Sequence, residues 1–271
     1  MKRLPALLVS VLCACAWHRS AAQTGPPAAP PAFLVFDGLL NPDKPNLAPY
    51  GMTGFRGTGN VWRPGVPIDT VDEPGIESVV RFMATLGPGY YLDIENWPVV
   101  RVPEAEVQAN VGKLVQVAQI ARRTAPDRSF GFYGLLPHAV YWEVLLNDQA
   151  ALAHWRRSNE LSRPLAEPVD FVLPSLYTFY DDREGWKRAA LVTLEAARQF
   201  GKPVYPFIWW EYHEGNPKLA GQPLPRDYWR MQLQFVREHA DGVVIWGGYQ
   251  KAWDPNAPWW LETQDFLQTL R

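Results

Sequence analysis

The sequence predicts an α/β protein, a single-domain (β/α) barrel of seven or eight strands. Short apolar runs alternate with longer amphipathic segments along most of the chain. Apolar strands separated by helices are typical of a parallel sheet that is covered on both faces. An open doubly wound sheet is the alternative, but no glycine-rich phosphate loop follows any of the runs.

Six apolar runs are expected to form strands: 33–36, 90–94, 129–133, 171–176, 204–208 and 242–246. The long stretch 39–75 has room for one or two more. Six amphipathic segments are expected to form helices: 77–86, 104–124, 139–161, 185–200, 226–239 and 260–270. Because no internal repeat and no interior break interrupts this order, residues 32–271 are predicted to form one catalytic barrel.

Residues 1–22 are predicted to be an export signal. Lys2 and Arg3 precede an apolar stretch that ends near the small residues 20–22, and this segment is too short for a permanent membrane span. The stretch 12–15 also resembles a lipoprotein signal, which would place a lipid anchor on Cys15. The Pro- and Ala-rich residues 23–31 are expected to be a spacer. The mature protein is therefore expected in the periplasm or outside the cell.

The composition excludes several classes of partner. Loss of Lys2, Arg3 and Arg19 from the 26 basic residues leaves 23 against 28 acidic ones, which argues against nucleic acid and anionic membranes. Both cysteines lie in the export signal, and the five histidines show no metal-binding spacing. We therefore expect no metal, no cofactor and a monomer.

Two acids lie at the end of the predicted strand 90–94, one inside it and one directly after it. Asp93 and Glu95 are separated by Ile94 alone, and side chains at i and i+2 of a strand point to the same face. Like charges held this close raise the pKa of one carboxyl group. Such a group can donate a proton near neutral pH, so the pair is predicted to do acid–base chemistry.

The other strand ends carry aromatic and acidic side chains. In a (β/α) barrel the active site lies at these carboxyl ends. The residues found there, or directly after the acid pair, are Asp37, Trp97, Tyr133, Tyr177, Trp209, Glu211 and Trp246. Carboxylates surrounded by aromatic rings favour a carbohydrate site, with a polysaccharide or oligosaccharide as substrate. The dipeptide His213-Glu214 is expected in a solvated loop.

Five motifs resemble the hyaluronidase family of glycoside hydrolases. Leu-Asp-Ile-Glu-Asn-Trp-Pro (92–98) is similar to that family's Asp-Trp-Glu-x-Trp-x-Pro. The others follow in the family's order: Gly-Phe-Tyr-Gly-Leu-Leu-Pro (131–137), Leu-Pro-Ser-Leu-Tyr (173–177), Pro-Val-Tyr-Pro-Phe (203–207) and Gly-Val-Val-Ile-Trp-Gly (242–247). The resemblance covers about residues 85–250, and the first third of the chain is not clearly matched.

The resemblance implies a distorted (β/α) barrel and a retaining, substrate-assisted mechanism. Glu95 would then be the general acid and base, and Asp93 would orient the 2-acetamido group of the substrate. The carbonyl oxygen of that group would attack the anomeric carbon, an exception to the two-carboxylate scheme. Tyr133 and Tyr177 would bind around the reacting sugar, and Trp246 would form a wall of the pocket.

Two departures from the family pattern narrow the expected substrate. The mature domain has no cysteine, so the disulfides of the animal members are not possible here. Trp209 stands where the family usually presents an arginine, so a uronate would lose a cationic partner. We therefore expect an N-acetylhexosamine-containing glycan that is less acidic than hyaluronan.

Three alternatives remain open at this point. A two-carboxylate retaining glycosidase could pair Glu95 with Glu211 from another strand end, and a muramidase could use the same Asp-x-Glu pattern. A non-catalytic carbohydrate-binding barrel would use the aromatic side chains while the acid pair did no chemistry.

Overall fold

Parallel pairing organises the strands of the computed structural model, which describes residues 32–271. One sheet has the order β2 (Thr53–Gly54), β1 (Leu34–Leu39), β7 (Gly242–Gly247) and β6 (Phe207–Trp209). The other has the order β3 (Arg56–Thr58), β4 (Gly89–Leu92) and β5 (Ser129–Phe132). The predicted export signal, with Cys15 and the spacer 23–31, lies outside the described residues.

The two sheets are joined on both sides, which gives the barrel that the sequence predicts. On one side a single residue, Phe55, separates β2 from β3. On the other side the segment 172–178 bridges β5 and β6, through the pairs Tyr133–Leu173 and Ser175–Phe207. Backbone pairing, together with the chain itself between β2 and β3, therefore connects the strands around the barrel.

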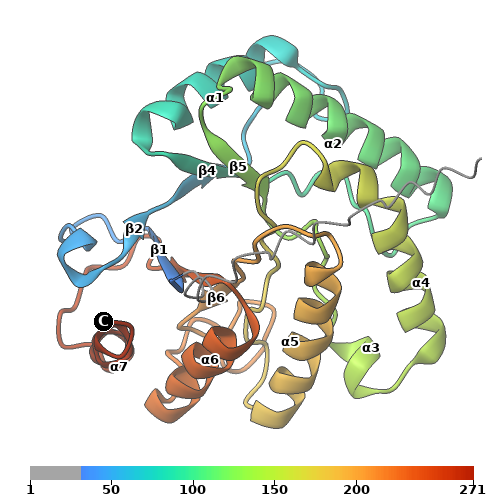
Figure 1. Ribbon diagram of the computed structural model, residues 1–271. Coiled ribbons are helices and arrows are strands. Elements are labelled where there is room, and N and C mark those ends of the chain that lie inside the picture. Colours follow the sequence, from blue (N-terminus) through green and yellow to red (C-terminus); the bar gives the residue numbers. More distant parts are fainter. Residues whose placement is uncertain (1–31) are drawn as a thin grey trace, which may run out of the picture. The chain divides into compact units, whose positions relative to one another are not determined.

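Helices surround these strands (Figure 1). The α-helices are α1 (Glu73–Leu86), α2 (Glu104–Thr124), α3 (Trp142–Leu145), α4 (Gln149–Leu161), α5 (Arg183–Arg198), α6 (Arg226–His239) and α7 (Pro258–Gln268). Two short 3-10 helices, η1 (Ala48–Tyr50) and η2 (Arg163–Ala166), lie between them in the chain. Within residues 32–271, no helix has the length and apolar content needed to cross a bilayer.

The strands separate an inner from an outer apolar core. Along β4, Tyr91 packs in the inner cluster with Phe55 and Phe207, whereas Tyr90 and Leu92 pack in the larger outer cluster beneath the helices. This alternation follows from the two-residue period of a strand. It decides, strand by strand, which side chains can reach the mouth of the barrel.

Two of the predicted strands are interrupted. The run 171–176 forms isolated bridges rather than a continuous strand, and the run 204–208 pairs continuously only in β6. Pro174 and Pro206 explain the breaks, because proline has no N–H to donate to a ladder. Both prolines still accept hydrogen bonds, at 2.8 Å from the Phe207 N–H and at 2.9 Å from the Val244 N–H.

The predicted helix 139–161 is wrong as a single element, since the structure divides it into α3 and α4. Asn147 has a φ of 53°, in the left-handed region that ends a helix. Asp148 then caps α4, because its Oδ1 accepts the Ala151 N–H at 3.0 Å. The late start of α3 also leaves residues 134–141 as a loop after β5, at the end of the barrel where a site is expected.

A substitution of Gly57 on β3 tests the packing beneath the barrel mouth. A Cβ atom there would lie 2.3 Å from the ring of Tyr91, its partner in the β3–β4 register. We expect Gly57→Ala to lower the free energy of unfolding by about 1–3 kcal/mol, measured by urea denaturation. Gly112→Ala in α2 is the control, because nothing lies within 4 Å of its added Cβ, and we expect it to stabilise the protein by about 0.5–1 kcal/mol. Equal effects of the two substitutions would contradict this account of the packing.

Candidate functional site

The acid pair follows directly from the register of β4. Tyr91 points into the inner cluster, and Asp93 and Glu95 follow at intervals of two, while Ile94 between them is buried in the outer core. The Asp93 N–H still donates to the Thr58 carbonyl at 3.0 Å, which extends the strand pairing to the acid itself. Both carboxyl groups line one cavity of about 220 Å³, named here the acid cavity.

Asp93 is the more buried member of the pair. Its Oδ1 is buried and has no hydrogen-bond partner among the residues that the structure describes. Burial, and then the neighbouring charge of Glu95, raise the pKa of Asp93 to about 7. Because an ionised carboxylate without a donor is costly in such a place, Asp93 holds a proton up to neutral pH.

Aromatic rings form the wall of the acid cavity facing the two acids. The centroid of the Tyr177 ring lies 5.9 Å from that of Tyr133, 5.5 Å from that of Trp209 and 5.6 Å from that of Trp246. The hydroxyl of Tyr133 donates to the Oγ of Ser175 at 3.1 Å. The result is a continuous apolar surface with polar edges, the kind of surface on which a sugar ring packs.

The same two-residue period brings these rings together from four different segments. Trp246 lies two residues after Val244, and Trp209 lies two residues after Phe207. Tyr177 lies four residues after Leu173. Val244, Phe207 and Leu173 all belong to the inner cluster, so the three rings lie on the inward-facing side of their segments. Since parallel strands end at the same rim of a barrel, the inward-facing side chains at these strand ends converge there. The structure therefore gathers Tyr133, Tyr177, Trp209 and Trp246 around the acid pair, as predicted from the strand ends.

A second cavity, of about 260 Å³, adjoins the first and is named here the side cavity. Glu95, Tyr133, Tyr177 and His213 line both, so Glu95 stands at the boundary between them. Trp97 lines the side cavity but is only 2% exposed, since its Nε1–H donates to the Ile68 carbonyl at 2.9 Å. Its place is therefore in the wall, with a small accessible edge.

Asp37 does not lie with the acid pair. It lies on the same face of β1 as Val35 and Leu39, which pack in the outer core, and it lines neither cavity. It is 4% exposed and pairs with Lys44, while the Nη2 of Arg56 lies 3.7 Å from its Oδ2. The structure gives this carboxylate an ion pair on the outer side of the barrel wall.

Glu211 is likewise separate from the acid pair. It is 2% exposed, forms an ion pair with Lys251, and lines neither cavity. Burial raises the pKa of Glu211, and its contact with Lys251 opposes that rise. The structure does not bring Glu211 together with Glu95.

His213 and Glu214 are the site residues that the sequence reasoning missed. Both lie in a loop, as expected, but this loop lines the acid cavity. The His213 ring lies 4.4 Å from that of Phe179, its Nδ1 accepts the Gly215 N–H at 3.0 Å, and burial lowers its pKa. Because Nδ1 accepts this hydrogen bond, the proton of the ring lies on Nε2, and the lowered pKa favours the neutral form. Their position four and five residues after β6, in a loop at the carboxyl end of the barrel strands, was the signal that could have found them.

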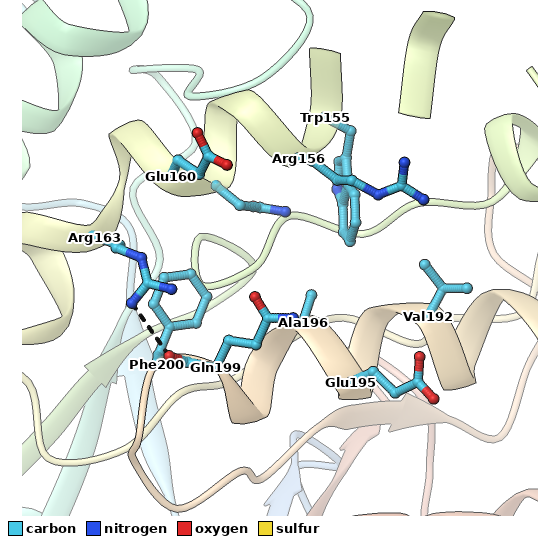
Figure 2. A pocket seen from close by; sticks show the side chains of 10 residues that line it. Trp155, Arg156, Glu160, Arg163, Val192, Glu195, Ala196, Gln199 and Phe200 are labelled. Carbon is cyan, nitrogen blue, oxygen red and sulfur yellow. Dashed lines mark hydrogen bonds between the residues drawn. The ribbon is translucent and has the colours of Figure 1, made fainter. Parts of the chain in front are cut away.

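A further cavity, of about 250 Å³, lies in the helix layer between α4 and α5 (Figure 2). Arg156 and Glu160 reach it from α4 and Glu195 from α5, while Arg163 donates to the Gln199 carbonyl at 3.4 Å. Its charges are of both signs, and none of the predicted site residues lines it. Within residues 32–271, no three acidic or histidine side chains gather in a way that could hold a metal ion.

Comparison with solved structures relates this arrangement to known barrels. Bee venom hyaluronidase matches with a TM-score of 0.62 and 16% identity, over 88% of this chain and 97% of that chain. The same enzyme in complex with a hyaluronic acid tetramer matches with a TM-score of 0.57 and 14% identity, over 88% and 96% of the two chains. A putative α-L-fucosidase from Bacteroides thetaiotaomicron matches with a TM-score of 0.52 and 11% identity, over 89% and 95%.

Sequence comparison gives no such relation, since neither a family model nor a curated protein matches the chain. At 11–16% identity, the structural likeness shows the fold alone. The protein is an α/β barrel of the type found in these glycosidases.

The raised pKa of Asp93 predicts a pH-dependent effect of Asp93→Asn on stability. Between the unfolded pKa of about 4 and the folded pKa of about 7, the folded protein binds more protons, so its stability falls as pH rises through this window. Asp93→Asn does not titrate and therefore does not lose stability in this window. We expect the free energy of unfolding of the variant minus that of the wild type to increase from pH 4 to 7 by on the order of 1–3 kcal/mol and then to level off.

Urea denaturation at pH 4.5, 6 and 8 measures this difference. Glu106→Gln, an exposed acid in the first turn of α2, is the control, and it should show no comparable change between pH 6 and 8. A stability difference for Asp93→Asn that is the same at all three pH values would mean that Asp93 is ionised throughout.

Proposed function

We propose that this protein is a retaining glycoside hydrolase that cleaves an N-acetylhexosamine-containing glycan by substrate-assisted catalysis. The observation that carries the proposal is the acid pair itself: Asp93 and Glu95 share one cavity at the barrel mouth, and Asp93 keeps a proton up to about pH 7. The wall of aromatic rings beside them supports a sugar as the ligand. The predicted export signal favours a substrate outside the cytoplasm.

In the first step, Glu95 donates its proton to the glycosidic oxygen, and the bond from that oxygen to the anomeric carbon breaks. The carbonyl oxygen of the substrate's 2-acetamido group attacks the same carbon and forms a cyclic oxazolinium intermediate. The ionised carboxylate of Asp93 accepts the amide N–H and stabilises the positive charge that develops on the amide. No carboxylate of the protein forms a covalent bond.

In the second step, the carboxylate of Glu95 takes a proton from water, and the resulting hydroxide attacks the anomeric carbon. The oxazolinium ring opens and the acetamido group is restored. Two inversions at the anomeric carbon give net retention. Glu95 ends the cycle protonated, as it began.

The shared proton explains why two adjacent acids are needed. In the free protein, burial places the proton of the pair on Asp93. When the amide N–H of a substrate donates to Asp93, it stabilises the ionised form of that group. The proton then passes to Glu95, which is the more exposed acid and stands at the boundary of both cavities. Binding of an acetamido group thus prepares the acid for the reaction.

One observation favours a second candidate, a two-carboxylate retaining mechanism. Glu214 lines the acid cavity with Glu95, whereas the predicted partner Glu211 does not. Such an enzyme would use Glu214 as its nucleophile and would not need a 2-acetamido group. A substrate with a 2-hydroxyl group in place of the acetamido group therefore separates the two mechanisms, since substrate assistance requires the amide carbonyl.

Glu95→Gln tests the proposed activity directly. Without the acid, we expect kcat on an N-acetylhexosamine polymer to fall by about 100-fold or more, while the Kd for an oligosaccharide changes little. Asp93→Asn should also reduce kcat strongly, because it can no longer stabilise the charged intermediate as an anion. If the protein cleaves no glycan and Glu95→Gln binds oligosaccharides unchanged, the barrel is a non-catalytic binding protein.

The proton of the pair also sets the expected pH dependence. Since the acid form is required, kcat/KM should fall by about tenfold for each pH unit above about 7, where the free pair loses its proton. A pH–rate profile from pH 5 to 9 on a neutral substrate measures this limb. Activity that stays constant up to pH 9 would show that the pair is not the acid.

A further inference from the structure

We infer that the cleft is built for amino-sugar glycans without negative charge, and that Glu214 binds the free ammonium group of a partly N-deacetylated N-acetylhexosamine polymer. The inference rests on the proposed function for the reaction, but it concerns a different property of the same site, which is its charge. Three observations carry it: the absence of cations from the described cleft walls, the unpaired state of Glu214, and the rigid turn that presents it.

The described residues that line the acid cavity and the side cavity include Asp93, Glu95 and Glu214, and neither lysine nor arginine. Burial lowers the pKa of His213, which lines both cavities, and that of His138, which lines the side cavity, so a positive charge on either ring is disfavoured. With three acids and neither lysine nor arginine in its wall, the cleft disfavours a carboxylate or sulfate on a bound sugar even while the acid pair holds one proton.

Three cations on neighbouring segments are held by other carboxylates. Lys44 pairs with Asp37, and Lys251 pairs with Glu211. Arg101 pairs with Glu143, with its Nη2 2.7 Å from Oε1. Recruiting any of them for a uronate would leave its own partner unpaired, and two of these partners, Asp37 and Glu211, are buried. This cost argues against an anionic substrate.

Glu214 differs from these acids, because it is exposed at the cavity and has no ion pair or hydrogen bond among residues 32–271. Its backbone is nevertheless well fixed. The His213 N–H donates to the Thr178 carbonyl at 2.8 Å, and the Asn216 N–H donates to the His213 carbonyl at 2.9 Å. The backbone on either side of Glu214 is thus fixed, and its carboxylate, which has no partner among the described residues, is available to a cation of the ligand.

Asn216 is the anchor of this turn. It is only 4% exposed, and its Oδ1 accepts the N–H groups of Lys218 and Leu219, each at 2.8 Å. The turn therefore does not need to reorganise when a ligand binds, so little conformational entropy is lost.

The chemistry of the reaction places the ammonium group on a neighbouring sugar. The reacting sugar must keep its acetyl group, since the amide carbonyl is the nucleophile. A fully N-acetylated polymer can use the aromatic wall but leaves Glu214 without a partner, whereas a partly N-deacetylated polymer offers both an acetamido and an ammonium group. An exposed pair of this kind contributes a few-fold in affinity and is weakened by salt.

Binding of three tetrasaccharides tests this inference independently of catalysis. The probes are an N-acetylglucosamine tetramer, its partly N-deacetylated counterpart and a hyaluronan tetramer, and Kd values are measured by calorimetry with wild-type protein and with Glu95→Gln. We expect the partly N-deacetylated tetramer to bind about three- to fivefold more tightly than the neutral one at low salt. The hyaluronan tetramer should bind most weakly, and the preference should shrink at 0.5 M salt.

Glu214→Gln should abolish the preference for the ammonium-bearing tetramer while leaving the Kd of the neutral one within about twofold. Glu238→Gln is the matched control. It removes one exposed carboxylate near the carboxyl end of α6, on the opposite side of the barrel from the carboxyl ends of the strands. It should leave all three Kd values unchanged.

The outcomes separate this inference from the proposed function. If the tetramers bind in the expected order but none is cleaved, the charge selection stands and the hydrolase proposal fails. If an N-acetylated polymer is cleaved but hyaluronan binds as tightly as the neutral tetramer, or if Glu214→Gln leaves the preference intact, the inference about charge is overturned.

Discussion

The two-residue alternation of side chains along parallel strands is the constraint on which the site depends. It turns Tyr91 and Asp93 toward the barrel interior and Ile94 toward the helices, and it continues to Glu95 at the rim. A shift of one residue in the β3–β4 pairing would place both acids in the outer core. Gly57 protects this register, because no side chain fits between β3 and the ring of Tyr91.

The acid pair shows how a stable barrel accommodates a destabilising group. Asp93 lies where an ionised carboxylate lacks hydrogen-bond donors, so neutral pH costs the protein folding free energy. The buried acids Asp37 and Glu211 instead form ion pairs with lysines. The absence of such a partner at Asp93 is what leaves a transferable proton at the barrel mouth.

Periodicity and strand-end composition allowed much of the architecture to be predicted. The helix 226–239 has the predicted bounds, and the aromatic residues Tyr133, Tyr177, Trp209 and Trp246 converge as expected. The failures are local and have identifiable causes. Prolines 174 and 206 interrupt strands that were apolar enough to be continuous, and the left-handed Asn147 divides a helix whose pattern continues across it.

The sequence by itself indicated the barrel, because strands and helices alternate along the whole chain, and the shared direction of Asp93 and Glu95, because that depends only on spacing along one strand. Only the tertiary structure decided which other acids join them. Asp37 and Glu211 also lie at or near strand ends, but their surroundings direct them to Lys44 and Lys251, whereas the turn anchored by Asn216 brings Glu214 to the cavity. Glu211 and Lys251 are 40 residues apart, and the turn is held to Thr178 on another segment, so contacts between distant segments decide these two outcomes. Asp37 and Lys44 are only seven residues apart, but the strand-end pattern does not show that they pair.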